Sequence, residues 1–537
     1  MKDQIDALHK SILESTKNYN NILKLMKLYE AFPQINKLTD SGDSQSIQTL
    51  RYLTVSLFKI FYKLSTKLQL NPSMASNANE KLLFQWLKKL YELNFKKNVL
   101  LNYMVSMEYE NSLSMDCLDI YMKCIELEAT FFASKMGAPY FPNKTLSKLI
   151  ETLFSGASSS SNTNKQYLFD QLSENYYKKY VDIQYYFQIE LQELISAGSI
   201  PYETQTSSYW LALMDHDNHY DNANSDLAIF VPNPPSTMEN EIKFKTQFEK
   251  NWIFILSNPQ TTSYQFKQFL TILHKRIIPH FVTPTKLMDF LTDCYDNVEN
   301  DLSVQLLSLN GLFELMKNYN LEYPNFYTKL YALFKPELFH LKYRSRFLRL
   351  IDIFLRSSHL SSNLIAGFMK KMSRSLLTSS PNAIVSVIPM IYNLLKLHPN
   401  CMILIHDPDY INPYFTNSKG EIEQRIFHDA FDINEPNPEF SNAINSSLWE
   451  LETLMHHYHP NVASLAKIFQ QPFRKMSYNM EDFLDWNYKS FLNSELKRSL
   501  KILPALDHQN KGDCFFADGN TDVQNLQNDV YMDAITW

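Results

Sequence analysis

The sequence predicts an all-α protein, an irregular helical-repeat solenoid of the HEAT or armadillo kind. Glycine is scarce: only nine of the 537 residues are glycine, and sheet hairpins, bulges and phosphate-binding loops depend on this residue. Apolar residues instead recur at helical spacing along the chain. No strict repeat with a period of about 33 to 45 residues is visible, so no named repeat class is indicated.

Four segments carry the helical pattern most clearly. Residues 118–132 place apolar side chains on one face of a helix of about four turns, and residues 302–316 and 347–355 repeat such a stripe. Residues 384–397 are apolar on nearly all sides, which predicts a helix buried between its neighbours.

Three positions are predicted to begin helices. Asp301 precedes one apolar stripe and is expected to cap it by accepting an amide hydrogen bond. Thr283 is followed by Pro284, a pair in which the hydroxyl is expected to cap and proline fills the first turn. Tyr323 followed by Pro324 indicates a third start.

Shifts in composition divide the chain into eight parts. Hydrophobic residues make up 45% and aromatic residues 14% of the sequence, which is enough apolar area for a folded chain. Ser-rich, Asp/Asn-rich and Pro-rich stretches interrupt the helical pattern and predict loops or linkers. The predicted parts are an N-terminal helical region 1–154, a Ser-rich loop 155–164, a helical segment 165–214, a linker 215–242, a central helical core 243–406, a Pro-rich linker 407–440, a C-terminal helical segment 441–503, and an acidic tail with an apolar end 504–537.

Charge and cysteine content limit the partners and the compartment. The net charge is −6 and the pI about 6.2, which argues against sequence-specific DNA binding because such proteins need a positive excess. Five cysteines without disulfide or zinc spacing predict a reducing compartment. No secretory signal or membrane span is recognised, so we expect an intracellular protein without a membrane partner.

The sequence lacks the usual signatures of catalysis. It contains no Walker lysine after a Gly-rich loop, no GxGxxG, no GxSxG and no HExxH, so we predict no catalytic residue and no cofactor. The run DHDNHYD at 215–221 crowds possible metal ligands, but polar residues in a linker are expected to point into solvent, and we predict no metal site. Cys117 and Cys124 are expected to be core thiols on one helix.

A basic stretch stands out in this acidic chain. Between residues 341 and 374, eight cations stand against one acid, Asp352, so that eight minus one leaves +7. Two adjacent helices are predicted to present these cations as one basic ridge that binds RNA phosphates or an acidic partner, and the alternative is a solvated helix face. The ridge residues are Lys342, Arg344, Arg346, Arg349, Arg356, Lys370, Lys371 and Arg374.

Two groups of large apolar residues near the C-terminus are candidates for docking a partner. The first group lies on apolar stripes, where the side chains either pack in the core or bind a partner. The second ends the acidic tail, where the residues are either disordered, as termini often are, or act as anchors. The first group is Trp449, Phe483 and Trp486, and the second is Tyr531, Met532, Ile535 and Trp537.

Long phrases of the sequence resemble a known family. These are HKRIIPHFVTPTKLMDFL (274–291), LNGLFELMKNYNLEYPNFY (309–327), SLWELETLMHHYHPNVASLAKIF (447–469) and SYNMEDFLDWNY (477–488). They are similar to the CCAAT-binding-factor/Noc domain family, in particular to its members that build the small ribosomal subunit. Supporting phrases outside the shared domain are GAPYFPNKT (137–145), DIQYYF (182–187) and IFVPNPP (229–235), so the resemblance covers most of the chain.

This resemblance implies a non-catalytic ribosome biogenesis factor of the nucleolus and nucleus. Its implied partners are nucleolar protein fourteen, other proteins of the small-subunit processome or 90S pre-ribosome, and pre-rRNA, whose direct contact is left open. The implied role is in small-subunit rRNA maturation, assembly and nuclear export. The acidic charge balance argues against reading the family's CCAAT-binding label literally. The alternative is a karyopherin-like helical-repeat transport adaptor, which would bind a small GTPase and cargo.

Overall fold

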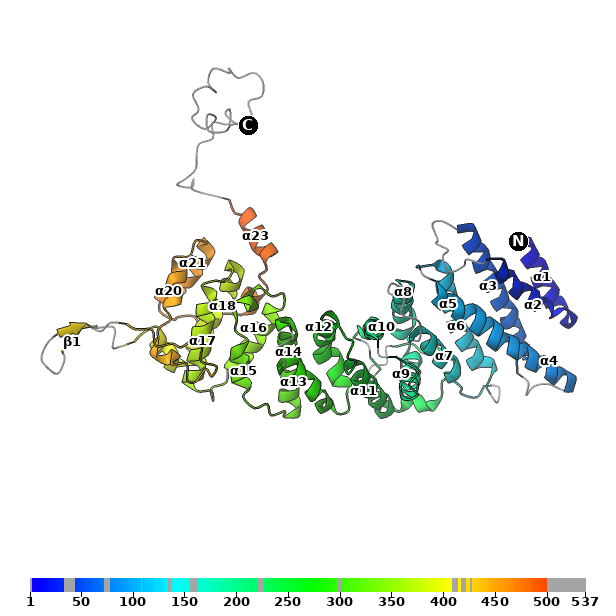
Figure 1. Cartoon of the computed structure of the whole chain (residues 1–537), viewed down its shortest axis with the longest axis horizontal. Coiled ribbons are helices and arrows are strands. Elements are labelled where there is room, and N and C mark those ends of the chain that lie inside the picture. The colour runs from blue at the N-terminus through cyan, green and yellow to red at the C-terminus, as the bar shows by residue number, and fades with distance from the viewer. Residues whose placement is uncertain are drawn as a thin grey trace, which may run out of the picture. The chain divides into compact units, whose positions relative to one another are not determined.

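The computed structural model describes residues 2–32, 44–71, 78–107, 109–133, 137–154, 163–201, 203–217, 219–220, 227–296, 301–407, 414–416, 422–424 and 427–499. The chain divides into two compact units, which are residues 1–355 with 434–438, and residues 356–433 with 439–537. Nearly all regular structure in the described residues is helical (Figure 1). The predicted all-α fold is confirmed.

The first unit is built from sixteen α-helices within its described residues. They are α1 (Lys2–Glu14), α2 (Asn21–Lys27), α3 (Ser44–Thr66), α4 (Ala78–Lys89), α5 (Asn102–Ser106), α6 (Ser112–Phe131), α7 (Asn143–Phe154), α8 (Thr163–Leu172), α9 (Val181–Ser196), α10 (Thr204–Met214), α11 (Glu241–Leu256), α12 (Ser263–Ile272), α13 (Met288–Asp296), α14 (Leu302–Tyr319), α15 (Phe326–Ala332) and α16 (Arg344–Leu355). Three π-helical segments extend some of them, at Leu90–Leu101, Ser173–Tyr177 and Leu273–Ile277.

The second unit contains further α-helices and one small hairpin. The helices are α17 (Ser362–Leu376), α18 (Pro381–Leu397), α20 (Trp449–Met455), α21 (Pro460–Ala466), α22 (Glu481–Leu484) and α23 (Tyr488–Leu496). The strands β1 (Tyr414–Thr416) and β2 (Ile422–Gln424) pair antiparallel, with Phe415 opposite Glu423. Short 3₁₀ turns in the two units are Thr16–Asn18, Leu28–Ala31, Ser236–Glu239, Ile278–His280, Pro284–Leu287, Pro336–His340, Pro399–Leu404, Ala443–Asn445 and Lys467–Gln470.

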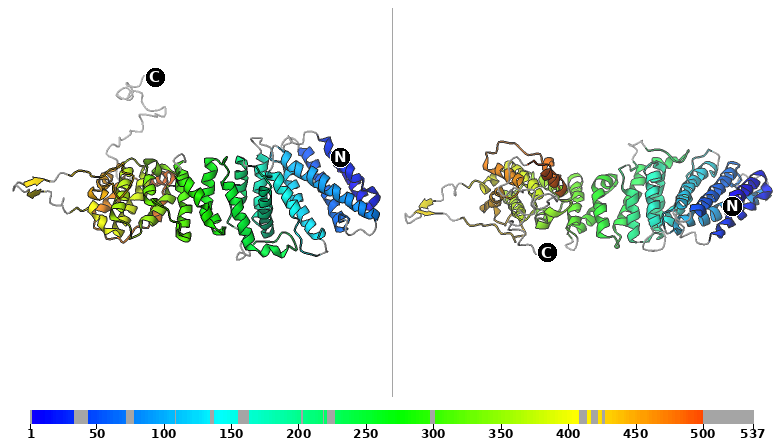
Figure 2. Two further views of the ribbon diagram at one scale, coloured as in Figure 1. Left: turned by 60° about the horizontal axis from the view of Figure 1, so that its bottom comes forward. Right: turned by 90° about the horizontal axis from the view of Figure 1, so that it is seen from above.

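Helices of the first unit pack mainly on helices that are close to them in the sequence. α3 packs on α6, α7 and α11 pack on α9, and α12 and α13 pack on α14. Figure 2 shows the helices of this unit lying side by side in chain order. Contacts restricted to near neighbours are typical of a solenoid, so the predicted helical-repeat class is confirmed.

The four strongest apolar patterns all form helices. Residues 118–132 fall on α6 and its C-terminal cap, 302–316 on α14, and 347–355 on α16. In α18 every residue from 382 to 395 is buried, as its all-round apolar pattern predicts. Burial on all sides explains why this helix has almost no polar face.

The predicted helix starts differ in outcome. The Asp301 carboxylate accepts the backbone N–H of Ser303 at 3.3 Å and caps α14, as predicted. A helical turn begins at Pro284, with proline in its first turn as predicted, but the expected cap is wrong, because the Thr283 side chain caps no amide of this turn. The Thr283 hydroxyl instead donates to the buried Glu249 carboxylate at 2.8 Å. The helix expected after Tyr323 and Pro324 begins at Phe326, as α15.

Three sequence phrases that lie far apart converge on α9. The Asp182 carboxylate accepts the backbone N–H groups of Phe230, at 3.1 Å, and Val231, at 2.8 Å. The ring of Phe141 stacks on that of Tyr186, with centroids 4.0 Å apart. GAPYFPNKT, DIQYYF and IFVPNPP therefore contribute to one packed region, and one end of the stretch predicted as a linker is held against a helix.

Candidate functional site

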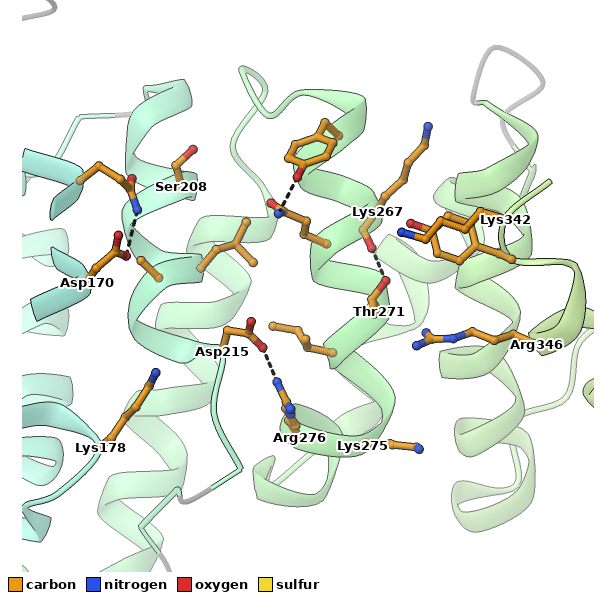
Figure 3. A pocket seen from close by; sticks show the side chains of 17 residues that line it. Asp170, Lys178, Ser208, Asp215, Lys267, Thr271, Lys275, Arg276, Lys342 and Arg346 are labelled. Atoms are coloured by element: carbon orange, nitrogen blue, oxygen red, sulfur yellow. Dashed lines mark hydrogen bonds and ion pairs between the residues drawn. The ribbon is translucent and has the colours of Figure 1, made fainter. Parts of the chain in front are cut away.

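A basic groove lies on the first unit, with a volume of about 970 Å³. It is lined by residues of α8, α10, α12 and the start of α16, together with the π-helical turn Leu273–Ile277 (Figure 3). The lining residues with charged side chains are Asp170, Lys178, Asp215, Lys267, Lys275, Arg276, Lys342 and Arg346. Six cations and two acids leave a charge of +4 (six minus two) in a chain of net charge −6.

Two of the six cations are neutralised by neighbours. Arg276 forms ion pairs with both Asp215 and Asp217. Lys267 pairs with Asp301 at 2.5 Å, the same residue that caps α14. These pairs hold the wall of the groove in place and leave little positive charge there for a ligand.

The other four cations form no ion pair within the described part of the chain. They are Lys178, Lys275, Lys342 and Arg346. Figure 3 shows Arg346 extending from α16 toward the turn that carries Lys275 and Arg276. The Nη1 atom of Arg346 is enclosed and has no hydrogen-bond partner. An enclosed guanidinium donor without an acceptor favours binding of an anion.

Arg346 also affects a neighbouring histidine. Burial, together with the positive charges of Arg346 and Lys275, lowers the pKa of His274 to about 4. His274 therefore stays neutral at pH 7 and adds no charge to the groove.

Local backbone structure explains how these cations come together. Lys275 and Arg276 lie on the π-helical turn that ends α12, and such turns widen a helix locally and often occur at functional sites. Lys342 lies in the turn just before α16, with its ammonium 5.9 Å from the centre of the Tyr343 ring. Lys178 follows the π-helical segment after α8. Three separate turns thus supply the lysines, and helix α16 supplies Arg346.

Sequence reasoning found only part of this groove. Lys342 and Arg346 belong to the predicted basic ridge, whereas Lys178 and Lys275 were missed. The pair Lys275–Arg276 was visible in the phrase HKRIIPHFV. Lys178 carried no comparable signal, since its proximity depends on the packing of α8, α10 and α12.

The ridge prediction needs correction at two residues. Lys370 is fully buried and Arg344 is 6% exposed, so neither belongs to an exposed ridge. Arg344 donates to the carbonyl oxygen of Phe339 at 2.9 Å. The ridge residues also divide between the two units, with Arg356, Lys370, Lys371 and Arg374 in the second.

Lys370 and Arg374 instead form an internal ionic network with α20. Both cations contact Glu450, each at 2.8 Å, and Arg374 also pairs with Asp429 at 2.7 Å. Burial opposes ionisation of the Asp429 carboxyl group. Hydrogen bonds nevertheless hold its pKa well below its usual range, and one of them comes from the indole of Trp449. These charges are satisfied within the protein, and their role is structural.

The candidate docking aromatics have mixed environments. Trp449 is 36% exposed and its ring faces the Arg374 guanidinium at 4.8 Å. Trp486 and Phe483 are half-buried, and the Trp486 ring lies 5.7 Å from that of Phe491. Trp449, Phe483 and Trp486 all belong to the second unit. The tail candidates Tyr531, Met532, Ile535 and Trp537 lie outside the described residues.

The expectation that the DHDNHYD run points into solvent is wrong for its histidines. His216 is 7% and His219 is 1% exposed, and their ring centroids are 4.3 Å apart. Burial lowers the pKa of His216 to about 4 and that of His219 well below its usual value. In the described part of the chain, no group of three or more His, Cys, Asp or Glu side chains is arranged to hold a metal.

Two other sequence expectations concern cysteines and membranes. Cys117 and Cys124 are fully buried, as predicted, and burial raises the pKa of the Cys124 thiol to about 12. None of the described helices combines the length and the apolar character that crossing a bilayer requires.

Comparison with known proteins decides the family. Residues 305–466 match the CBF/Mak21 family, and residues 1–199 match the family described as nucleolar complex protein 4-like, TPR repeats. Nucleolar complex protein 4 of Saccharomyces cerevisiae is 48% identical over 541 residues, which cover 97% of this chain and 96% of that protein. The chain belongs to the nucleolar complex protein 4 family.

Similarity to the nucleolar complex protein 4 family extends to other organisms over about half of the chain. The human homolog is 38% identical over 264 residues, which cover 48% of each protein. An uncharacterized protein of Schizosaccharomyces pombe is 46% identical over 280 residues, 52% of this chain and 53% of its own length. The chain is therefore a nucleolar, nuclear protein, as predicted. Its membership of the nucleolar complex protein 4 family supports a role in ribosome biogenesis.

Proposed function

We propose that this protein is a non-catalytic scaffold of the small-subunit processome, or 90S pre-ribosome, and acts there as a complex with nucleolar protein fourteen. It holds its partner and pre-rRNA elements in place during small-subunit rRNA maturation, assembly and nuclear export. The observation that carries this proposal is the similarity to yeast nucleolar complex protein 4 along nearly the whole chain.

The fold supports a scaffold role. Helices stacked on near neighbours offer extended surfaces for partners. The polar groups of the basic groove are six cations, two carboxylates, and several amide and hydroxyl groups. This arrangement binds anions, and it lacks a nucleophile held against a general base, the pairing that covalent catalysis needs.

The C-terminal helices are the proposed docking surface for nucleolar protein fourteen. Trp449 and Trp486 each expose part of an aromatic ring, and partly exposed aromatic residues often dominate protein interfaces. Leu492 and Leu496 lie one turn apart on α23 and are 63% and 83% exposed. These leucines add exposed apolar surface to the helix that follows Trp486.

Affinity purification of the tagged chain at low salt, followed by mass spectrometry and probing for the small-subunit rRNA precursor, tests the proposal. Recovery of nucleolar protein fourteen with this precursor is expected. A Leu492→Glu/Leu496→Glu variant should lose nucleolar protein fourteen while keeping its melting temperature, since both side chains are exposed. A Lys497→Glu variant, which changes charge at the end of the same helix, serves as the control.

The tail is tested separately by deleting residues 525–537. If the tail anchors are docking residues, the deletion should reduce the recovery of a partner. Unchanged recovery of every partner would remove the tail from the docking surface.

The alternative function, a transport adaptor, predicts a different result in the affinity purification. The tagged chain would then recover a small GTPase and mixed cargo without precursor RNA, and that outcome would overturn the scaffold proposal.

A further inference from the structure

We propose that the basic groove binds the backbone of single-stranded RNA, with phosphates at Lys178, Lys275, Lys342 and Arg346 and one base on the ring of Tyr264. This inference rests on the proposed function for the origin of the RNA in the pre-ribosome. The geometry of the groove supports the contact with RNA independently of that function.

The placement of the cations favours an extended anion over a compact one. The four cations without ion pairs come from three separate turns and from helix α16, around a volume of about 970 Å³. A single small anion fills a fraction of this space and cannot touch all of them. A chain of phosphates reaches successive cations, and arginine and lysine side chains are the usual partners of phosphate oxygens.

An aromatic ring at the rim favours a single strand over a duplex. Tyr264 lies on α12, lines the groove and is 69% exposed. Its hydroxyl accepts a hydrogen bond from the Gln268 amide at 3.2 Å, which holds the ring in position. Bases of a duplex are stacked on each other, whereas an unpaired base can stack on an exposed ring.

The polar groups between the cations favour RNA over an acidic peptide. The Asp170 carboxylate lines the groove and accepts a hydrogen bond from the Gln166 amide at 3.2 Å. A carboxylate repels an acidic side chain, but it accepts a hydrogen bond from a ribose 2′-hydroxyl. The hydroxyl of Ser208 and the amide of Gln268 offer further partners for sugars and base edges.

Fluorescence anisotropy of the purified full-length chain with a labelled oligouridine of about twelve nucleotides tests this inference. The groove variant is Lys178→Gln/Lys275→Gln/Lys342→Gln/Arg346→Gln. The matched control is Lys10→Gln/Lys67→Gln/Lys123→Gln/Lys250→Gln, which removes four exposed cations of the same unit outside the groove.

Loss of four phosphate contacts should weaken binding on the order of 100-fold at 0.1 M salt and reduce the slope of log K against log salt by about 3. Tyr264→Ala should weaken binding about tenfold without changing that slope. The control should bind like the unmodified chain. Because Arg346 is half-buried, the variant with only the three lysines replaced is measured alongside, and it should show about three quarters of the slope change.

Equal binding by the groove variant and the control would overturn the inference. Equal or tighter binding of a glutamate peptide of the same length would overturn it in favour of an acidic protein segment. Equal binding of a duplex RNA would overturn the assignment to a single strand. Recovery of nucleolar protein fourteen reports only on the proposed function, since oligonucleotide binding by the purified chain needs no partner.

Discussion

Lys370 on α17 and Glu450 on α20 form an ion pair 2.8 Å long, and neither side chain is exposed to solvent. The two residues are 80 positions apart in the sequence. The Lys370 ammonium also donates to the carbonyl oxygen of Ser447. A buried pair with its remaining hydrogen bonds satisfied holds two elements together, and it is sensitive to removal of either partner.

The first prediction follows from this pair. Lys370→Met should lower the free energy of unfolding by about 3 kcal/mol, because Glu450 stays enclosed with only Arg374 to neutralise it. Glu450→Gln should cost at least as much, since the fully buried Lys370 then keeps only the more distant Asp429, 3.6 Å away, as an anionic neighbour. Chemical denaturation monitored by circular dichroism measures both. Lys467→Met, at an exposed lysine of the same unit, should change stability by less than about 0.5 kcal/mol. If the Lys370→Met variant were as stable as the unmodified chain, the buried ion pair would not stabilise the protein, and the prediction would be wrong.

The second prediction concerns the Asp182 carboxylate, which joins the phrases DIQYYF and IFVPNPP. Asp182→Ala leaves the backbone N–H groups of Phe230 and Val231 without their acceptor. Each buried unsatisfied donor costs about 1–3 kcal/mol, so we expect a loss of about 3 kcal/mol in total. Hydrogen exchange should become faster at residues 228–231. Glu193→Ala, at an exposed acid on the same helix, should leave exchange there unchanged.

The third prediction is a pH dependence of stability. The pKa of His216 is lowered to about 4 by burial, and by the positive charges of Lys178 and Arg276. Between pH 6.5 and 4 the unfolded chain therefore binds more protons than the folded chain, so the free energy of unfolding falls as pH drops through this window. For one such histidine, the free energy of unfolding falls by about 1.5 kcal/mol between pH 6.5 and 5.

This pH dependence should weaken when the histidines are replaced. Urea denaturation of a His216→Phe/His219→Phe variant at pH 6.5 and pH 5 should show at most half of the original decrease. The exposed His340, replaced by phenylalanine, is the control and should keep the full decrease. An equal decrease in all three proteins would assign the pH dependence to other groups.

The fourth prediction concerns a close approach of α13 and α14 at Gly311. A Cβ added at Gly311 of α14 would stand 2.9 Å from both Cδ atoms of Leu291 on α13, a fully buried residue. Gly311→Ala should therefore destabilise the protein by about 1–3 kcal/mol by overpacking, despite the better helix propensity of alanine. Leu291→Val removes both Cδ atoms, so adding it should recover part of this loss. Thermal denaturation of the single and double variants measures the coupling.

Local pattern was enough to predict the fold class and its clearest helices. The apolar stripe at 302–316, its cap at Asp301 and the all-round apolar segment 384–397 became α14 and α18 as expected. Helical periodicity and capping depend on residues within about four positions, and a sequence displays them directly. The family, too, was recognisable from its long phrases, and similarity along nearly the whole chain established it.

The sites depended on contacts between distant segments. The sequence placed Lys370 among exposed cations, because its partner Glu450 lies 80 residues away. It likewise placed His216 in a solvent-exposed linker, although packing buries this side chain. Lys178 joins Arg346 in the basic groove only because the helices between them stack in order. Composition and periodicity therefore determined the all-α solenoid, whereas tertiary packing decided which charges are buried and which face a ligand, since burial and pairing depend on neighbours that local sequence does not specify.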